Sequence, residues 1–313
     1  MPTEPVANTL AVADEMDVAI DAGDIKAVKA LLEQGADIEG KDRNGFTPVF
    51  VAALHNKTEI MRLLIDRGAD IEHVTDDAGD SLLVHVVLNN NVEITQLLIA
   101  KGADLDKPRN NDETPLTMAT FKQLPEMIRM LLNAGADIDG KNAQGNTALF
   151  AATSWDHPLM ARLLLDKGAD VNVCGKDGRS PLSVAALNGN IGLTRLLLAK
   201  GADLNQQSVA GMTPLMEAVV FNQPESVRLL LEKGADIDIQ DANGNTAMTH
   251  ASEDDRQETS RLLMEFIETR ERRAAENAKA EAAAQEQTRH AAVALKQQSL
   301  KKLAQQNRPK IGF

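Results

Sequence analysis

One short motif, repeated at an almost constant interval, constrains the fold of this sequence more than any other feature. A leucine pair is followed by Gly-Ala-Asp seven times, and successive glycines of the motif are 33 or 34 residues apart. These glycines are Gly35, Gly68, Gly102, Gly135, Gly168, Gly201 and Gly234. A fixed period of this length indicates similar structural units that stack side by side, because one such unit cannot bury its apolar face alone.

Each repeating unit has the pattern of two short helices. In one unit, Thr47 is a residue type that caps helices and Pro48 suits the first helical position, so we expect a helix that ends near His55. A second helix carries apolar residues at helical spacing and should stop at Gly68, since glycine adopts the left-handed conformation that closes helices. Prolines are expected to open the second helices of three other units, at Pro125, Pro158 and Pro224.

A second motif follows most of the repeated glycines by twelve residues. It consists of Thr or Ser, usually Pro, and a small apolar run, as in TPVFVAA from Thr47, TPLTMAT from Thr114 and SPLSVAA from Ser180. Together the two motifs resemble the ankyrin repeat over about residues 13–268. The resemblance implies an all-α solenoid of about eight helix–turn–helix units, including atypical terminal caps, joined by β-hairpin turns.

Two departures from the family pattern affect the turns. The histidine of the family's TPLH motif is replaced in every unit, so other groups must make the hydrogen bonds that it gives to the turn. The third unit also has one inserted residue near Asp76–Gly79, which predicts a locally altered hairpin.

The chain divides into three parts. We expect a disordered N-terminal tail over residues 1–12, the solenoid over 13–268, and a basic C-terminal helix with a short tail over 269–313. The last part is rich in strong helix formers, but its apolar positions do not sustain a coiled coil. From Arg270 onward it has 10 Lys plus Arg against 4 Glu, a net charge of +6, whereas the rest of the chain carries −19. A solvated helix, a lid folded across the acidic solenoid, and a docking or delivery tail all stay open.

Composition disfavours several classes of function. The net charge of −13 would repel nucleic acid, and the single cysteine, Cys174, fits a reduced cytoplasmic setting. The sequence shows neither a secretory signal nor an apolar run of the roughly 20 residues that a membrane span needs. It also shows no histidines at metal-ligand spacing, no phosphate-binding loop and no nucleophile elbow. We therefore expect a cytoplasmic monomer with no cofactor, metal, membrane contact or enzymatic activity.

The resemblance implies a concave binding surface formed by the hairpin tips and by the exposed end of the first helix in each unit. An apolar row falls at the helix ends, and three of the seven phenylalanines and the only tryptophan occupy the implied positions. Such a row is costly unless a partner covers it, although its leucines could equally be packing at the edge of the core. The candidate partner-binding residues are Phe46, Leu54, His55, Leu88, Phe121, Lys122, Trp155, Arg179, Leu187, Met212 and Phe221.

These features favour a protein–protein interaction module that holds one partner protein in its concave groove. Two alternatives stay open from the sequence. One is a secreted bacterial effector that acts in a host cell and uses the basic tail as a delivery signal. The other is an inhibitor or immunity protein whose acidic solenoid plugs the basic active site of an enzyme.

Overall fold

The computed structural model describes residues 5–72, 81–108, 113–252 and 256–306, which form sixteen helices and no strand. The first helices of successive units are α1 (Pro5–Ala22), α3 (Pro48–Leu54), α5 (Leu82–Leu88), α7 (Pro115–Phe121), α9 (Ala148–Ser154), α11 (Pro181–Leu187), α13 (Pro214–Val220) and α15 (Ala247–His250). The second helices are α2 (Ile25–Glu33), α4 (Thr58–Asp66), α6 (Val92–Ala100), α8 (Pro125–Ala134), α10 (Pro158–Asp166), α12 (Ile191–Ala199), α14 (Pro224–Glu232) and α16 (Gln257–Gln306).

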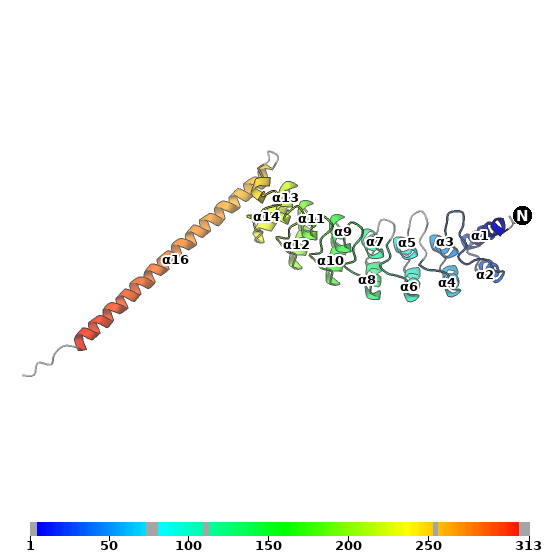
Figure 1. Ribbon diagram of the computed structural model, residues 1–313, viewed down its shortest axis with the longest axis horizontal. Coiled ribbons are helices and arrows are strands. Elements are labelled where there is room, and N and C mark those ends of the chain that lie inside the picture. The colour runs from blue at the N-terminus through cyan, green and yellow to red at the C-terminus, as the bar shows by residue number, and fades with distance from the viewer. Residues whose placement is uncertain (1–4, 73–80, 109–112, 253–255, 307–313) are drawn as a thin grey trace, which may run out of the picture.

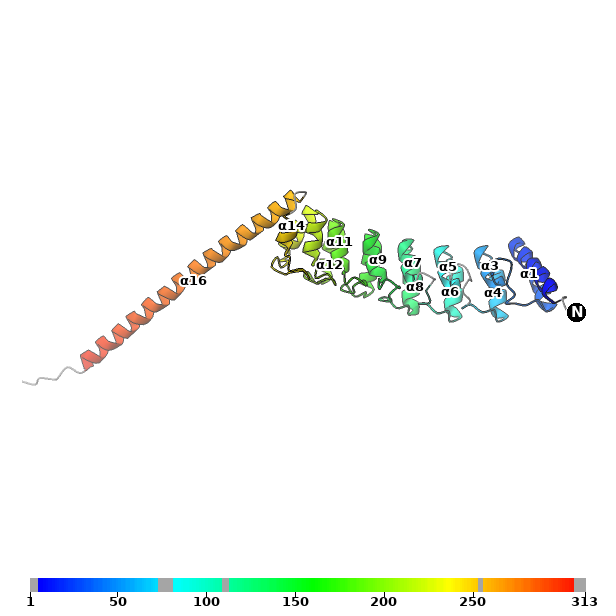
Figure 2. The same cartoon turned by 45° about the horizontal axis from the view of Figure 1, so that its top comes forward.

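The helices up to α14 stack in two rows, and the units follow one another along a gently curved line (Figures 1 and 2). First helices pack on first helices, as α11 does on α9 and α13, and second helices pack on second helices, as α12 does on α10 and α14. The buried apolar side chains form one continuous cluster from the first unit to the last. This arrangement confirms the predicted all-α solenoid. Within the described residues, no helix is both long enough and apolar enough to span a membrane.

The helix boundaries follow the local sequence signals. Pro125, Pro158 and Pro224 open α8, α10 and α14, as predicted. Gly68 follows α4 with a φ of 94°, a left-handed conformation that residues with a Cβ adopt only at a cost. The repeated glycine therefore ends the second helix of its unit.

Hydroxyl side chains cap most of the first helices. In six units the hydroxyl oxygen accepts a hydrogen bond from the backbone N–H three residues on, at Ser81, Thr114, Thr147, Ser180, Thr213 and Thr246. The prediction that the Thr47 side chain does the same is wrong, because its hydroxyl makes no such bond and has no partner among the described residues. The N–H of Phe50, which would supply that bond, donates to the Thr47 carbonyl oxygen instead, at 2.9 Å.

In three units, a pair of hydroxyl groups lies at the position of the family's histidine. They join Thr114 to Thr117 at 3.1 Å, Ser180 to Ser183 at 3.1 Å, and Thr246 to Thr249 at 3.2 Å. The first two pairs are buried, so each hydroxyl satisfies the other away from water. Other groups thus make the polar contacts at this position of the turn, as expected.

Neighbouring units are joined by a ladder of hydrogen bonds near the hairpins. A side-chain oxygen of one unit accepts from the N–H of the Gly-Ala-Asp aspartate in the next, at 2.7 to 3.1 Å. The accepting residues are Glu39, Glu72, Asp106, Asp139, Asn172 and Asn205. Burial raises the pKa of the Asp106 and Asp139 carboxyls above the usual range, despite the bonds that they accept. The next residue in the series, Asp238, pairs instead with Arg270 of α16 at 2.7 Å.

The terminal parts differ from the predicted boundaries. Helix α1 begins at Pro5, so most of the segment expected to be a disordered tail over residues 1–12 is helical. Its Pro at the first helical position and its alanines favour a helix, and its second half packs on α3. The expected boundary at residues 268/269 falls inside α16, because one uninterrupted run of helix formers continues the second helix of the last unit. The altered hairpin expected near Asp76–Gly79 lies outside the described residues.

The long C-terminal helix leaves the solenoid. Leu262 and Leu263 are buried against the last units, whereas every residue from Arg270 to His290 is exposed. Figures 1 and 2 both show α16 running away from the stack at the end opposite α1. The helix therefore does not fold back as a lid over the solenoid of its own chain.

Candidate partner-binding surface

The row of apolar residues at the ends of the first helices comprises Leu54, Leu88, Phe121, Trp155, Leu187 and Phe221, and we call it the inner row. Three of its members are exposed: Leu54 at 38%, Phe121 at 45% and Phe221 at 48%. The other three are half-buried, and Leu88 packs against the core. The row is thus most open at Leu54, Phe121 and Phe221, and Leu88 acts partly as edge-of-core packing.

Phe121 and Trp155 form the aromatic centre of the inner row. Their ring centroids are 4.9 Å apart in an edge-to-face arrangement, which is a favourable geometry for two aromatic rings. The Lys122 ammonium lies 5.9 Å from the Phe121 ring centroid, and the His157 ring lies 6.2 Å from that of Trp155. The two units therefore present a polar-edged aromatic patch.

The turns behind the inner row hold it in register. Five of the turns into a second helix contain a non-glycine residue with positive φ between 51° and 56°, at Asn56, Asn90, Gln123, Asp156 and Asn222. Side chains of the following unit bond to these turns: Asn91 to Asn56, Asn190 to Asp156, and His157 to Gln123 at 3.2 Å. Because His157 also contacts the Thr120 carbonyl oxygen, at 3.3 Å, it links the turns on either side of the aromatic patch.

Two predicted residues near the hairpins, Phe46 and Met212, are half-buried and pack against the core. The Phe46 ring stacks on Phe50 with centroids 5.1 Å apart, and Phe50 in turn contacts His85 at 5.1 Å. The structure brings neither residue to the patch formed by Phe121 and Trp155. Phe46 and Met212 therefore belong chiefly to the packing between hairpin and helix.

Two predicted charged residues are engaged with neighbouring units. His55 lies 3.0 Å from the Asp21 carboxylate, and both side chains are exposed. Arg179 donates from Nε to Oε1 of Glu217 at 2.8 Å and from Nη2 to Oε2 at 3.5 Å. Glu217 is only 1% exposed, and this hydrogen bonding raises the pKa of the Arg179 guanidinium. The arginine is therefore held by a buried carboxylate of the next unit.

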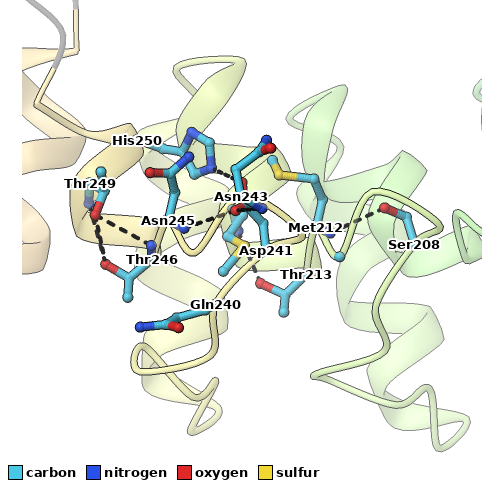
Figure 3. Close-up of polar contacts among 12 residues, drawn as sticks. Ser208, Met212, Thr213, Gln240, Asp241, Asn243, Asn245, Thr246, Thr249 and His250 are labelled. Carbon is cyan, nitrogen blue, oxygen red and sulfur yellow. Dashed lines mark hydrogen bonds and ion pairs between the residues drawn. The ribbon is translucent and has the colours of Figure 1, made fainter.

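The last unit carries a similar polar contact that sequence reasoning did not single out. The His250 ring faces Asp241, with Nε2 and Oδ2 2.9 Å apart (Figure 3). The Asp241 Oδ1 also accepts from the N–H groups of Asn243 and Asn245, at 2.8 and 2.9 Å. The Asn245 bond first, and the His250 side chain after it, hold the pKa of the Asp241 carboxyl below its usual range. His250 and Glu217 occupy the same position of their units, which is the only sequence signal that could have linked them.

Potential catalytic features are weak in the described residues. Burial raises the pKa of the Cys174 thiol, which disfavours the reactive thiolate at neutral pH. Its Sγ lies 2.9 Å from Nε2 of Gln206, in the next unit. Among the side chains that the structure describes, no group of three or more His, Cys, Asp and Glu could hold a metal ion.

Comparison with known proteins assigns the chain to a family. A family model described as ankyrin repeats in three copies matches residues 16–109, 67–142, 83–173, 170–241 and 195–273. The chain therefore belongs to the ankyrin-repeat family.

Similarity to individual curated proteins covers short segments. Protein phosphatase 1 regulatory subunit 27 of Mus musculus is 39% identical over 59 residues, which is 19% of this chain and 38% of that protein. Ankyrin repeat, SAM and basic leucine zipper domain-containing protein 1 of Mustela putorius furo is 42% identical over 52 residues, 17% of this chain and 11% of that protein. The chain thus spans 38% or less of the length of these curated relatives.

Proposed function

We propose that this protein is a non-catalytic module that binds a partner protein through the inner row, with Phe121 and Trp155 as anchors. The observation that carries the proposal is the edge-to-face contact between the exposed Phe121 ring and the half-buried Trp155 ring at the middle of the solenoid. Exposed aromatic side chains with polar neighbours are the composition of binding hot spots. A role in binding another protein also agrees with the name of one relative, which is a phosphatase regulatory subunit.

The residues divide into two groups by their contacts. Leu54, Phe121 and Phe221 are exposed enough to lose substantial water-accessible area to a partner. Lys122, beside Phe121, supplies a charge at the rim of the patch. The second group, which consists of Phe46, Leu88, Arg179 and Met212, positions the surface through contacts within the protein.

The proposal is tested with the double variant Phe121→Ala, Trp155→Ala. The matched control is Leu159→Ala, Val209→Ala, which removes two side chains that are 71% and 78% exposed but lie outside the inner row. Both variants and the wild type are used for affinity capture from a lysate of the source cell, and the captured protein is then titrated. Because anchor residues contribute about 2 kcal/mol or more each, we expect the aromatic variant to bind at least about 30-fold more weakly.

The control variant should bind as the wild type does. Circular dichroism of all three proteins shows whether the helices are retained. If the folded aromatic variant binds the captured protein within about threefold of the wild type, a shift of less than about 0.7 kcal/mol, the inner row is not the binding surface.

A further inference from the structure

The first unit has an apolar groove on the outside of the stack. The groove has a volume of about 570 Å³ and lies between α1 and α2, and none of its lining residues comes from α3 or α4. Val18 is 70% exposed in it, and the rest of its floor consists mainly of alanines and Leu31. Inside the stack, the corresponding surface of each unit is buried against the preceding unit. The exposed face of the first unit therefore resembles one half of a contact between units.

The groove is acidic at its rim. Its lining contains three carboxylates, those of Asp14, Glu15 and Asp24, and no basic side chain. Asp14 is paired with Arg43 at 2.6 Å, and Asp24 caps α2, whereas Glu15 has no ion-pair partner among the described residues. The first 25 residues of the sequence contain six acidic residues and neither Lys nor Arg. A ligand for this groove should therefore combine apolar and basic side chains.

The distal part of α16 has that composition. From Gln287 to Gln306, where α16 ends, the sequence contains four Lys and Arg and no acidic residue, and it includes Val293, Leu295, Leu300 and Leu303. Among its described side chains, Arg289 and Lys296 are exposed. The preceding stretch of α16, residues 269–286, has four basic and four acidic residues and only alanine as an apolar residue. The complementary charge is thus confined to the far end of the helix.

The distal part of α16 cannot reach the groove of its own chain. Arg270 fixes the base of the helix on Asp238, and the helix leaves the stack at the end opposite α1 (Figures 1 and 2). A helix of 50 residues is about 75 Å long, and this one points away from the first unit. The groove can therefore receive such a helix only from another molecule.

We propose that the distal part of α16 from one molecule docks in the α1–α2 groove of a second copy of this chain. The contact is head-to-tail, so a dimer keeps one free groove, on one molecule, and one free helix end, on the other. Association therefore continues beyond the dimer. Because opposite charges contribute to the contact, the assembly weakens as salt increases.

The test uses two full-length variants that each lack one side of the contact. The groove variant is Val18→Lys, Ala30→Lys, at two exposed positions where lysine repels the basic helix without disturbing the core. The helix variant is Lys296→Glu, Lys301→Glu, Lys302→Glu. Sedimentation velocity is measured over a concentration series at about 0.05 M and about 0.5 M salt, where the Debye length falls from about 14 to about 4 Å.

The wild type should form dimers and larger species at low salt, and each variant alone should stay monomeric. An equimolar mixture of the two variants should give a complex of two chains and nothing larger, because it offers only one intact groove and one intact helix end. The matched control Leu159→Lys, Val209→Lys should associate as the wild type does. A monomeric wild type, a mixture without dimers, or a groove variant that associates like the wild type would each overturn the proposal. The last outcome would point to pairing between α16 helices.

Discussion

The two partners of the buried ion pair between Arg179 and Glu217 should contribute unequally to stability, so that removal of the arginine costs more than removal of the glutamate. The Glu217 carboxylate is enclosed within the seventh unit, and the Arg179 guanidinium is its only charged partner among the described residues. Arg179 keeps a second carboxylate, Asp177, at 3.3 Å, and its side chain is 38% exposed. Loss of the arginine therefore leaves a buried, unpaired charge, whereas loss of the glutamate leaves an arginine that has another partner and water.

We expect Arg179→Met to destabilise the protein by about 2 to 3 kcal/mol. Breaking a fully buried pair costs about 3 to 5 kcal/mol, and the partial exposure of Arg179 lowers that figure because water can reach the carboxylate. Glu217→Met should cost less than about 1 kcal/mol, since a methionine of similar length fills the same space. The double variant should be close to the wild type, which corresponds to a coupling energy of about 2 kcal/mol.

Urea denaturation measures this directly. Unfolding is followed by circular dichroism and by the fluorescence of Trp155, which lies in the unit that precedes Arg179 and reports on local unfolding. Agreement of the two signals shows that the units unfold together, which the free energies require. Equal losses for the two single variants, or a double variant that shows their sum, would refute the assignment of a buried, unpaired charge.

Two further predictions concern the first and the last hairpins. The pKa of Asp17 is raised to about 6 by burial and by the carboxylate of Asp42. The folded state therefore binds the Asp17 proton more tightly than the unfolded state does. The stability that this proton contributes is lost as the pH rises from about 4 to about 6. Asp17→Asn should therefore stabilise the protein by about 1 to 2 kcal/mol at pH 7.5 and by almost nothing at pH 4, and equal urea midpoint shifts at both pH values would contradict this. Gly211 has a φ of 77°, and a Cβ there would lie 2.6 Å from the backbone nitrogen of Ala242, whereas Gly68 has open space. Gly211→Ala should cost at least about 1 kcal/mol more than Gly68→Ala, which bears only the left-handed backbone cost of about 1 to 2 kcal/mol, and equal thermal stabilities of the two variants would count against this reasoning.

The sequence predicted the solenoid well because its signals are local. The period of the glycines, the prolines at helix starts and the hydroxyl caps each act within a few residues, and the repetition of the unit reinforced every one of them. Thr47 shows the limit of such signals. Its sequence position is that of a cap, but the competing carbonyl oxygen of the same residue takes the N–H of Phe50.

The candidate surface was less predictable, because exposure depends on neighbours that are about one unit away in the sequence. Arg179 and Glu217 are 38 residues apart, so no local pattern shows that a buried carboxylate holds the arginine. Phe46 was placed on the surface by its position, yet it stacks on Phe50 of the following helix. The edge-to-face contact of Phe121 with Trp155 likewise joins two units, and only the structure shows it.

The sequence led us to expect a monomer, whereas the structure leads us to propose head-to-tail association. Composition gives the opposite charges of the two chain ends, but not their positions in space. The groove between α1 and α2 and the direction of α16 became visible only with the packing of the helices.

The ladder of hydrogen bonds between hairpins has a consequence for how proteins of this kind change in length. The accepting side chain always meets the N–H that lies 31 or 32 residues later, whatever the unit. Deletion or duplication of one whole internal unit would therefore join an existing acceptor to an equivalent donor and leave no bond unmade at the new junction. Arg270 takes the place of that donor at Asp238, so the number of units can vary by recombination in the interior while the C-terminal helix keeps its attachment.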